Sequence, residues 1–353
     1  MATPVRKSFE QGFIESQQIT QNLLRTIRLI GEYKGKQELF KEQSPQVLET
    51  LRLAAIIQST ESSNRIEGIT APLERIKELV AEKTTPRDRS EQEIAGYRDV
   101  LTTIHTSYAH IPFTPGVVLQ LHRDLYQFAV VEGGRWKSVD NEISEIHPDG
   151  TVRVRFQPVP AYATPTAMES LHERFNSEWQ LDEIEPLLLI PSYVLDFLCI
   201  HPFSDGNGRM ARLLTLLLLY KAGYEVGRFI SLERIVERTK ESYYDTLYQS
   251  SQNWHLGHHS LLSWWEYFLG VIVLSAYREF EQRVGLVTNV KGAKTAMVLD
   301  AISNMPFDFS ISDLQSQCPT VGIDLIRRIL RLERTEGRLE CLGRGPDARW
   351  QKK

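Results

Sequence analysis

The stretch HPFSDGNGRMAR, residues 201–212, carries the densest set of reactive side chains in the sequence. It holds one histidine, one aspartate, an asparagine between two glycines, and two arginines three residues apart. The apolar segment PSYVLDFLCI (191–200) precedes it, and a second apolar run, LLTLLLLY, begins at Leu213. Both have the composition of buried helices, so the stretch is predicted to join two core helices and to begin the second.

The glycines of this stretch suggest an anion site. Gly206, Asn207 and Gly208 stand where the second helix begins, so backbone N–H groups and the helix dipole can converge on one point. Arg209 and Arg212 follow, three residues apart and hence on one helix face. Two guanidinium groups suit a polyphosphate better than a single phosphate. The alternative is that the arginines merely solvate the helix start, which the apolar character of the rest of the helix disfavours.

The other side chains of the stretch predict proton and metal chemistry. Asp205 would repel phosphates unless Mg²⁺ bridged them, although without these neighbours it would be an ordinary turn aspartate. Pro202 should end the preceding helix and turn His201 toward the phosphates, where a neutral imidazole can accept a proton from a hydroxyl. Phe203 should point inward and anchor the loop. Cys199, two residues before the histidine, points elsewhere, which argues against a Cys–His nucleophile. Together these groups predict transfer of part of a nucleotide to a hydroxyl.

Helical periodicity dominates the rest of the first 285 residues. One helix is predicted between a start at Ser44-Pro45 and a stop at Gly68. Further helices are predicted from Pro72 and over 91–108, 114–130, 164–180, 209–224 and 264–284.

One segment breaks the helical pattern. The turn residues Pro148-Asp149-Gly150 separate two short runs, and the second run alternates apolar residues with arginines. A β-hairpin is therefore predicted over about 141–156, with Pro158 and Pro160 keeping it at a sheet edge. It is either a decorative surface loop or a strand edge offered to another chain.

The C-terminal part differs in character. Three short helical patterns (296–302, 310–317 and 321–337) precede two short strands around a Gly-Pro turn in 338–350. This order predicts a winged-helix domain after a boundary near 288–294. From Thr320 to Lys353 there are nine basic and five acidic residues. A DNA-binding regulator is therefore a second hypothesis, of a different class.

Composition excludes several other classes. The formal net charge of −4 over 353 residues gives no overall basic excess for nucleic-acid binding. The longest apolar run is too short for a bilayer and the N-terminus lacks a signal-peptide core, so we expect a cytoplasmic protein with no membrane contact. The three cysteines are far apart without zinc spacing. The histidines His255, His258 and His259 have no carboxylate or cysteine nearby, so no metal site is predicted there.

The central stretch resembles a known signature in full: HPFx[DE]GN[GK]RxxR of the Fic (filamentation induced by cAMP) family. GRWK (134–137) with the following hairpin resembles the family's segment before the active site, and ESYYDTL (241–247) resembles its later helix. The resemblance implies a helical Fic core over 101–285 with the hairpin at about 141–156 as its flap. An N-terminal helical region over 1–100 would precede the core, and a winged-helix domain over 290–353 would follow it.

The resemblance implies protein adenylylation: AMP passes from ATP to a Tyr, Ser or Thr hydroxyl of a target protein, and pyrophosphate leaves. By this resemblance His201 is the general base and Asp205 holds Mg²⁺. The α- and β-phosphates are held by Gly206, Asn207 and Gly208. The β- and γ-phosphates are neutralised by Arg209 and Arg212. The flap would bind the target's backbone as an added strand. Relatives with lysine at the position of Gly208 transfer the γ-phosphate instead, so this glycine favours AMP transfer. Tyr243 and Tyr244 either border the adenine pocket, pack in the core or become modified themselves.

A second motif resembles the family's inhibitory helix, [ST]xxxE[GN]. In SSNRIEGI (62–69), Ser63 and Glu67 are four residues apart and Gly68 follows. A carboxylate against Arg212 would take the partner meant for the γ-phosphate, so the enzyme would be inhibited in cis. By spacing alone Glu67 would be a solvated helix residue. Removal of AMP from modified proteins, with water positioned by the glutamate, is a third hypothesis. A homodimer is possible, and the sequence does not decide it.

Overall fold

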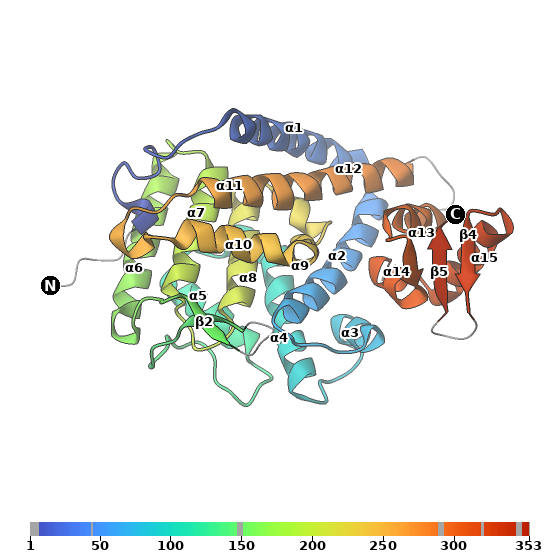
Figure 1. The fold of residues 1–353 in the computed structure, drawn as a ribbon, viewed down its shortest axis with the longest axis horizontal. Coiled ribbons are helices and arrows are strands. Elements are labelled where there is room, and N and C mark those ends of the chain that lie inside the picture. Colours follow the sequence, from blue (N-terminus) through green and yellow to red (C-terminus); the bar gives the residue numbers. More distant parts are fainter. Residues whose placement is uncertain are drawn as a thin grey trace.

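The computed structural model describes residues 7–43, 45–146, 151–288, 293–318, 321–343 and 348–352. Up to residue 288 the described elements are helical except for one hairpin (Figure 1). The helices are α1 (Gln21–Gln43), α2 (Pro45–Ile66), α3 (Leu73–Val80), α4 (Arg89–Ser107), α5 (Pro115–Leu125), α6 (Thr164–Leu181), α7 (Pro186–Ile200), α8 (Asn207–Lys221), α9 (Leu232–Arg238), α10 (Lys240–Ser251), α11 (Leu262–Tyr267) and α12 (Leu274–Thr288). The predicted mainly α fold is confirmed.

Helices α7 and α8 form the centre of the fold. Nearly every side chain of both helices is buried, because α7 is apolar on nearly all faces and α8 is apolar from Leu213 to Tyr220 apart from Thr215. The loop between them carries the central stretch, as predicted. Helix α7 begins at Pro186, five residues earlier than the apolar segment suggested, and Pro191 lies inside it. Trp264 of α11 donates its indole N–H to the Pro191 carbonyl at 2.7 Å. This hydrogen bond from a neighbouring helix stabilises the backbone at the proline.

Two further predicted helices differ in extent. Helix α5 ends at Leu125 rather than near residue 130. The chain leaves it through a tight turn in which the Tyr126 N–H donates to the Arg123 carbonyl, and this turn directs the Tyr126 ring toward α8. The segment 264–284 is not one regular helix, because the π-helical turn Phe268–Val273 separates α11 from α12.

Helix α2 connects the N-terminal region to the core. It begins at Pro45 and ends at Ile66, and Gly68 adopts a left-handed φ of +79° just beyond it, as the start and stop signals predicted. It packs mainly against α4 and α9, and so brings its C-terminal end beside the start of α8.

The hairpin consists of antiparallel strands β1 (Ile143–Ile146) and β2 (Val152–Phe156), with an irregularity between Ile143 and Ser144. The predicted hairpin is therefore present, and its predicted turn at 148–150 lies outside the described residues. Arg155 of β2 pairs with Asp245 of α10 at 3.2 Å, which holds the hairpin over the core.

A small C-terminal unit lies at one end of the molecule (Figure 1). Its elements are α13 (Ala293–Asn304), β3 (Asp308–Ser310), α14 (Ile311–Gln317), α15 (Ile323–Thr335), β4 (Leu339–Leu342) and β5 (Arg349–Lys352). The antiparallel sheet has the order β3-β5-β4. Strand β3 is absent from the sequence prediction, since three residues carry no readable alternation. The winged-helix interpretation of this unit stays a prediction. Among the described helices, none combines the length and apolar character that crossing a bilayer demands.

Candidate active site

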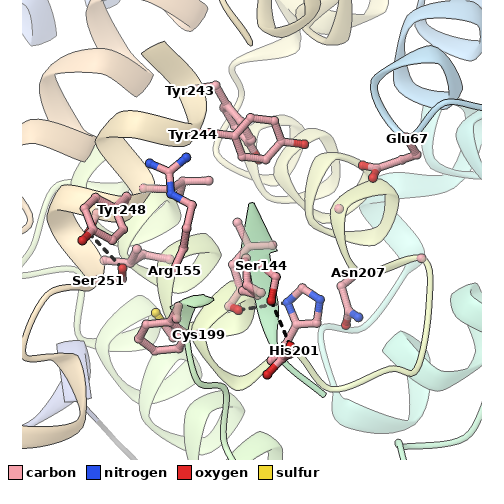
Figure 2. A pocket seen from close by; sticks show the side chains of 18 of the residues that line it. Glu67, Ser144, Arg155, Cys199, His201, Asn207, Tyr243, Tyr244, Tyr248 and Ser251 are labelled. Carbon is pink, nitrogen blue, oxygen red and sulfur yellow. Dashed lines mark hydrogen bonds between the residues drawn. The ribbon is translucent and has the colours of Figure 1, made fainter. Parts of the chain in front are cut away.

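His201 lies at the end of α7 in a left-handed conformation, with φ 51° and ψ 61°. Its Nδ1 lies 3.2 Å from the Leu198 carbonyl oxygen. A carbonyl only accepts, so this contact favours the proton on Nδ1 and leaves Nε2 as the basic nitrogen. Burial lowers the pKa of His201 to about 4, which keeps the imidazole neutral at physiological pH. Figure 2 shows the ring facing the cavity.

Phe203 and Asn207 close the loop after the histidine. Phe203 is fully buried and stacks on His122, with ring centroids 3.6 Å apart. Its backbone N–H donates to Asn207 Oδ1 at 2.9 Å, and Asn207 Nδ2 donates back to its carbonyl at 2.7 Å. The Asn207 side chain therefore shapes the loop, and the backbone N–H of this residue stands in the first turn of α8.

The first turn of α8 forms that anion site. Gly206 has a φ of +81°, and its N–H donates to Asp205 Oδ1 at 2.6 Å. The backbone N–H groups of residues 207–209 stand in the first helical turn, where no intrahelical acceptor exists. They combine with the helix dipole at the cavity wall. The Asp205 side chain is 66% exposed and lies beside this turn.

Arg209 points into the core of the fold. Its side chain is 1% exposed, and Nη1 lies 2.8 Å from Glu93 Oε2 of α4. Nη2 donates to the Tyr126 hydroxyl at 2.8 Å. A buried guanidinium needs a carboxylate partner, and Glu93 attracts it into the core. In this structure Arg209 supports the start of α8 from beneath, with Nη2 4.0 Å from Asp205 Oδ1, and Arg212 lines the cavity. The role of Arg209 at phosphates stays a prediction.

Arg212 forms hydrogen bonds with both residues of the predicted inhibitory motif, Ser63 and Glu67. Its Nε donates to the Ser63 hydroxyl at 2.9 Å, and Nη2 donates to the Ser63 carbonyl at 2.9 Å and to Glu67 Oε1 at 2.7 Å. Arg212 is 5% exposed, whereas the Glu67 side chain is 31% exposed. Glu67 also lies against Gly208, where an added Cβ would be 2.3 Å from Oε1. The motif thus covers both the arginine and the glycine loop.

One cavity of about 540 Å³ connects these groups. The glycine loop, His201 and Arg212 form one wall, the hairpin forms another, and α10 supplies the tyrosines (Figure 2). Tyr244 and Tyr248 line it, and the Arg155 guanidinium lies 4.7 Å from the Tyr248 ring centroid. A pocket of this size accommodates a nucleotide-sized ligand.

Several supporting residues escaped the sequence prediction. His122 Nδ1 accepts from the Gly134 N–H at 2.9 Å, and its Nε2 contacts the Asp205 carbonyl oxygen at 3.1 Å. Lys137 and Asn141 contact the His201 loop from the other side. No local spacing marks these residues, and the only signal was the resemblance of GRWK to a family segment.

The histidines that were discounted as metal ligands lie apart from the loop. His255 stacks on Phe156 at the base of the hairpin, and His259 is buried beside Ser8. Among the described residues, no group of three metal-binding side chains occurs.

The geometry defines an α-helical protein built around an anion-binding loop, and the part of the chain that carries this loop matches a known family model. Residues 112–219 match the model of the Fic/DOC family. This part of the chain is a Fic domain.

Two curated proteins share moderate similarity. "Protein adenylyltransferase Fic" of Nematostella vectensis is 28% identical over 185 residues, which are 48% of this chain and 39% of that protein. The Drosophila grimshawi protein of the same name is 26% identical over 236 residues, or 63% of this chain and 46% of its own length. The chain therefore spans less than half the length of these relatives.

Solved structures show that the fold is shared more widely. A Fic family protein from Desulfovibrio desulfuricans G20 has a TM-score of 0.62 at 23% identity, covering 95% of this chain and 97% of its own. A Fic domain containing signaling protein from Bacteroides thetaiotaomicron has a TM-score of 0.57 at 21% identity, covering 73% and 97%.

Proposed function

We propose that this protein transfers AMP from ATP to a Tyr, Ser or Thr hydroxyl of a target protein, and also to itself. The observation that carries the proposal is the shared cavity of His201, the glycine loop and Arg212. A neutral base and an anion site then face the same ligand.

The reaction follows from this arrangement. The acceptor hydroxyl oxygen attacks the α-phosphorus of ATP, and His201 Nε2 takes the hydroxyl proton. A new bond forms between that oxygen and the α-phosphorus. The bond from the α-phosphorus to the oxygen bridging it to the β-phosphate breaks, and pyrophosphate leaves. Backbone N–H groups of Asn207 and Gly208 hold the α- and β-phosphates during the transfer, and Gly206, whose N–H donates to Asp205, supplies the left-handed turn that places them.

Asp205 fits the role of a magnesium ligand. Mg²⁺ at phosphates needs only one or two protein carboxylates, with phosphate oxygens and waters completing its shell. The exposed Asp205 carboxylate at the edge of the anion site provides one such ligand. Bound there, the ion would neutralise phosphate charge.

Autoinhibition is the second part of the proposal. With Glu67 bound to Arg212, the guanidinium lacks the capacity to hold the γ-phosphate, and the carboxylate repels it. Displacement of the end of α2 frees the arginine and permits the productive ATP pose. The hairpin then serves as the flap that binds the target's backbone. Removal of AMP by a water beside Glu67 is an alternative use of the same cavity.

A second candidate function rests on α15. Its residues Arg327, Arg328, Arg331 and Arg334 are all exposed, and Figure 1 shows this helix on the side of the C-terminal unit away from the catalytic core. Such a surface suits DNA phosphates. If the full chain binds duplex DNA there, a gel shift should weaken with salt and be lost in Arg327→Glu/Arg331→Glu. Equal binding by that variant would rule this surface out.

Intact-mass spectrometry tests the main proposal. The Glu67→Gly chain incubated with Mg·ATP should gain the mass of one or more AMP groups, and Glu67→Gly/His201→Ala should gain none. A gain of phosphate alone, or loss of AMP from a chain modified beforehand with no new addition, would overturn it.

A further inference from the structure

The C-terminal end of α7 has an unusual set of partners. Helix ends leave their last carbonyls without intrahelical donors. In addition, His201 has a left-handed backbone conformation that residues other than glycine rarely adopt. Something outside the helix must therefore hold the backbone on which His201 is carried.

The backbone carbonyls from Phe197 to Phe203 all have donors. The first three carbonyls accept hydrogen bonds from His201 at the helix end or from the chain that follows the hairpin. Their donors are His201 N for Phe197, His201 Nδ1 for Leu198 and Val159 N for Cys199. The next four carbonyls accept from one short segment, 137–141, which leads into the hairpin, and the Phe203 carbonyl also accepts from Asn207 Nδ2 at 2.7 Å.

Lys137 and Asn141, which we call the clasp, supply these four contacts. Lys137 donates its Nζ to the Ile200 carbonyl at 3.1 Å and its backbone N–H to the Pro202 carbonyl at 2.8 Å. Asn141 Nδ2 donates to the carbonyls of His201 at 3.4 Å and Phe203 at 3.0 Å. Lys137 Nζ also donates to Asn141 Oδ1 at 2.7 Å, which joins the two side chains.

The burial of Lys137 carries an energetic cost. It is 3% exposed, and its described Nζ acceptors are a neutral amide and a carbonyl. Burial lowers the pKa of Lys137 to about 8. A lysine desolvated in this way lowers the stability of the fold. We therefore expect its contacts with the carbonyls of Ile200 and Pro202 to hold the backbone on either side of His201 in place.

We propose that Lys137 and Asn141 are positioning residues for His201: they hold its strained backbone so that Nε2 faces the anion site. This inference deepens the proposed function and rests on it. Strand β1 begins two residues after Asn141, so the clasp also joins the flap to the base in one unit. A target strand bound on the flap would thereby be placed relative to His201.

The test uses the full chain with Glu67→Gly as parent. Lys137→Met removes two contacts of Nζ while keeping most of the side-chain volume. Asn141→Asp keeps the shape and the acceptor for Lys137, but turns an oxygen toward the two carbonyls. Val139→Ala is the matched control, because this side chain lies in the same segment but is 74% exposed.

We expect kcat for AMP transfer to fall at least tenfold in both clasp variants, with KM for ATP unchanged within twofold, and no change in the control. Lys137→Arg, which retains a donor and the charge, should recover part of the rate. A purely structural role would instead lower the amount of folded protein, which thermal unfolding reports. If Lys137→Met does not fold, Asn141→Asp and Lys137→Arg decide the question.

Hydrogen exchange gives a readout that does not need activity. Amides of residues 200–208 should exchange faster in both clasp variants than in the parent and the control. Normal exchange with an unchanged kcat would refute the clasp while leaving AMP transfer intact. If the parent transfers no AMP, the proposed function fails, and unchanged exchange would then also refute the clasp.

Discussion

Arg212 of α8 donates to the Glu67 carboxylate just beyond α2 at 2.7 Å, across 145 residues of sequence. The same guanidinium also contacts both the hydroxyl and the carbonyl of Ser63. The positive charge of Arg212 beside the anion site is thus already neutralised by Glu67 of the same chain. Under the proposed function, nucleotide binding competes with this internal partner, and the end of α2 is where control would act.

Replacing Glu67 with glycine should raise AMP labelling at least tenfold. The change removes the internal partner of Arg212, and a tenfold effect corresponds to about 1.4 kcal/mol. Ser63→Ala should give a smaller rise, because the Ser63 carbonyl still accepts from the guanidinium. Glu49→Gly removes an exposed carboxylate from the other end of α2 and serves as the control. Equal labelling by all four chains would remove Glu67 from the account.

Gly208→Ala should weaken the inhibition when Glu67 is present. The added Cβ would lie 2.3 Å from Glu67 Oε1, so the carboxylate must move away from Arg212. In a double-mutant cycle with Glu67→Gly, we expect a coupling of about 1 kcal/mol, roughly fivefold in Mg·ATP affinity. Calorimetry on the four chains measures it. Identical effects of the alanine in both backgrounds would contradict this contact.

The acidic limb of the pH profile should lie well below pH 6. Because the pKa of His201 is lowered to about 4, its Nε2 remains available as a base down to that region. The kcat/KM profile of the Glu67→Gly chain reports the free enzyme, so its acidic limb should fall near pH 4 to 5. A limb centred at pH 6.5 would indicate a solvated histidine and contradict the lowering of the His201 pKa by burial.

Stability should fall as the pH is lowered from about 6.5 to 4. Burial lowers the pKa of five histidines, to about 3 for His105 and about 4 for His122, His172, His201 and His259. In the unfolded chain these groups bind protons near pH 6.5, so protons favour unfolding throughout this window. Each pH unit costs at most about 1.4 kcal/mol per histidine.

Asp196 opposes this trend. Its pKa is raised to about 6 by burial, so its protonation in the folded chain adds stability as the pH falls toward 4. Burial also raises the pKa values of Glu61, Glu178 and Asp300, which act in the same direction as Asp196. The five histidines outweigh these four carboxyl groups. Urea unfolding at pH 7 and pH 5 checks the sign, and an equal or larger free energy of unfolding at pH 5 would be incompatible with neutral buried imidazoles.

The sequence predicts those parts of the site that are local. An apolar segment before His201, a proline after it and a glycine pair before Arg212 each have a local consequence, and the structure has the loop between two buried helices as expected. The placement of Glu67 against Arg212 followed from the family motif, since helical spacing alone favours a solvated glutamate.

Long-range partners account for what the sequence did not predict. Arg209 was expected beside Arg212 because they are three residues apart, but its direction is decided by Glu93 of α4. The clasp on His201 likewise joins residues about 60 positions apart in the chain. Strand β3 exists because β5 pairs with it, and three residues do not encode such a partner. Tertiary contacts of this kind leave no periodic signal.

The most direct measurement of the central claim uses ATP labelled at either the α- or the γ-phosphate with the Glu67→Gly chain. The account predicts that protein retains label from the α position only, and that His201→Ala in the same background abolishes it while Mg·ATP still binds. Label retained from the γ position, or α-label that persists without His201, would contradict AMP transfer by this cavity.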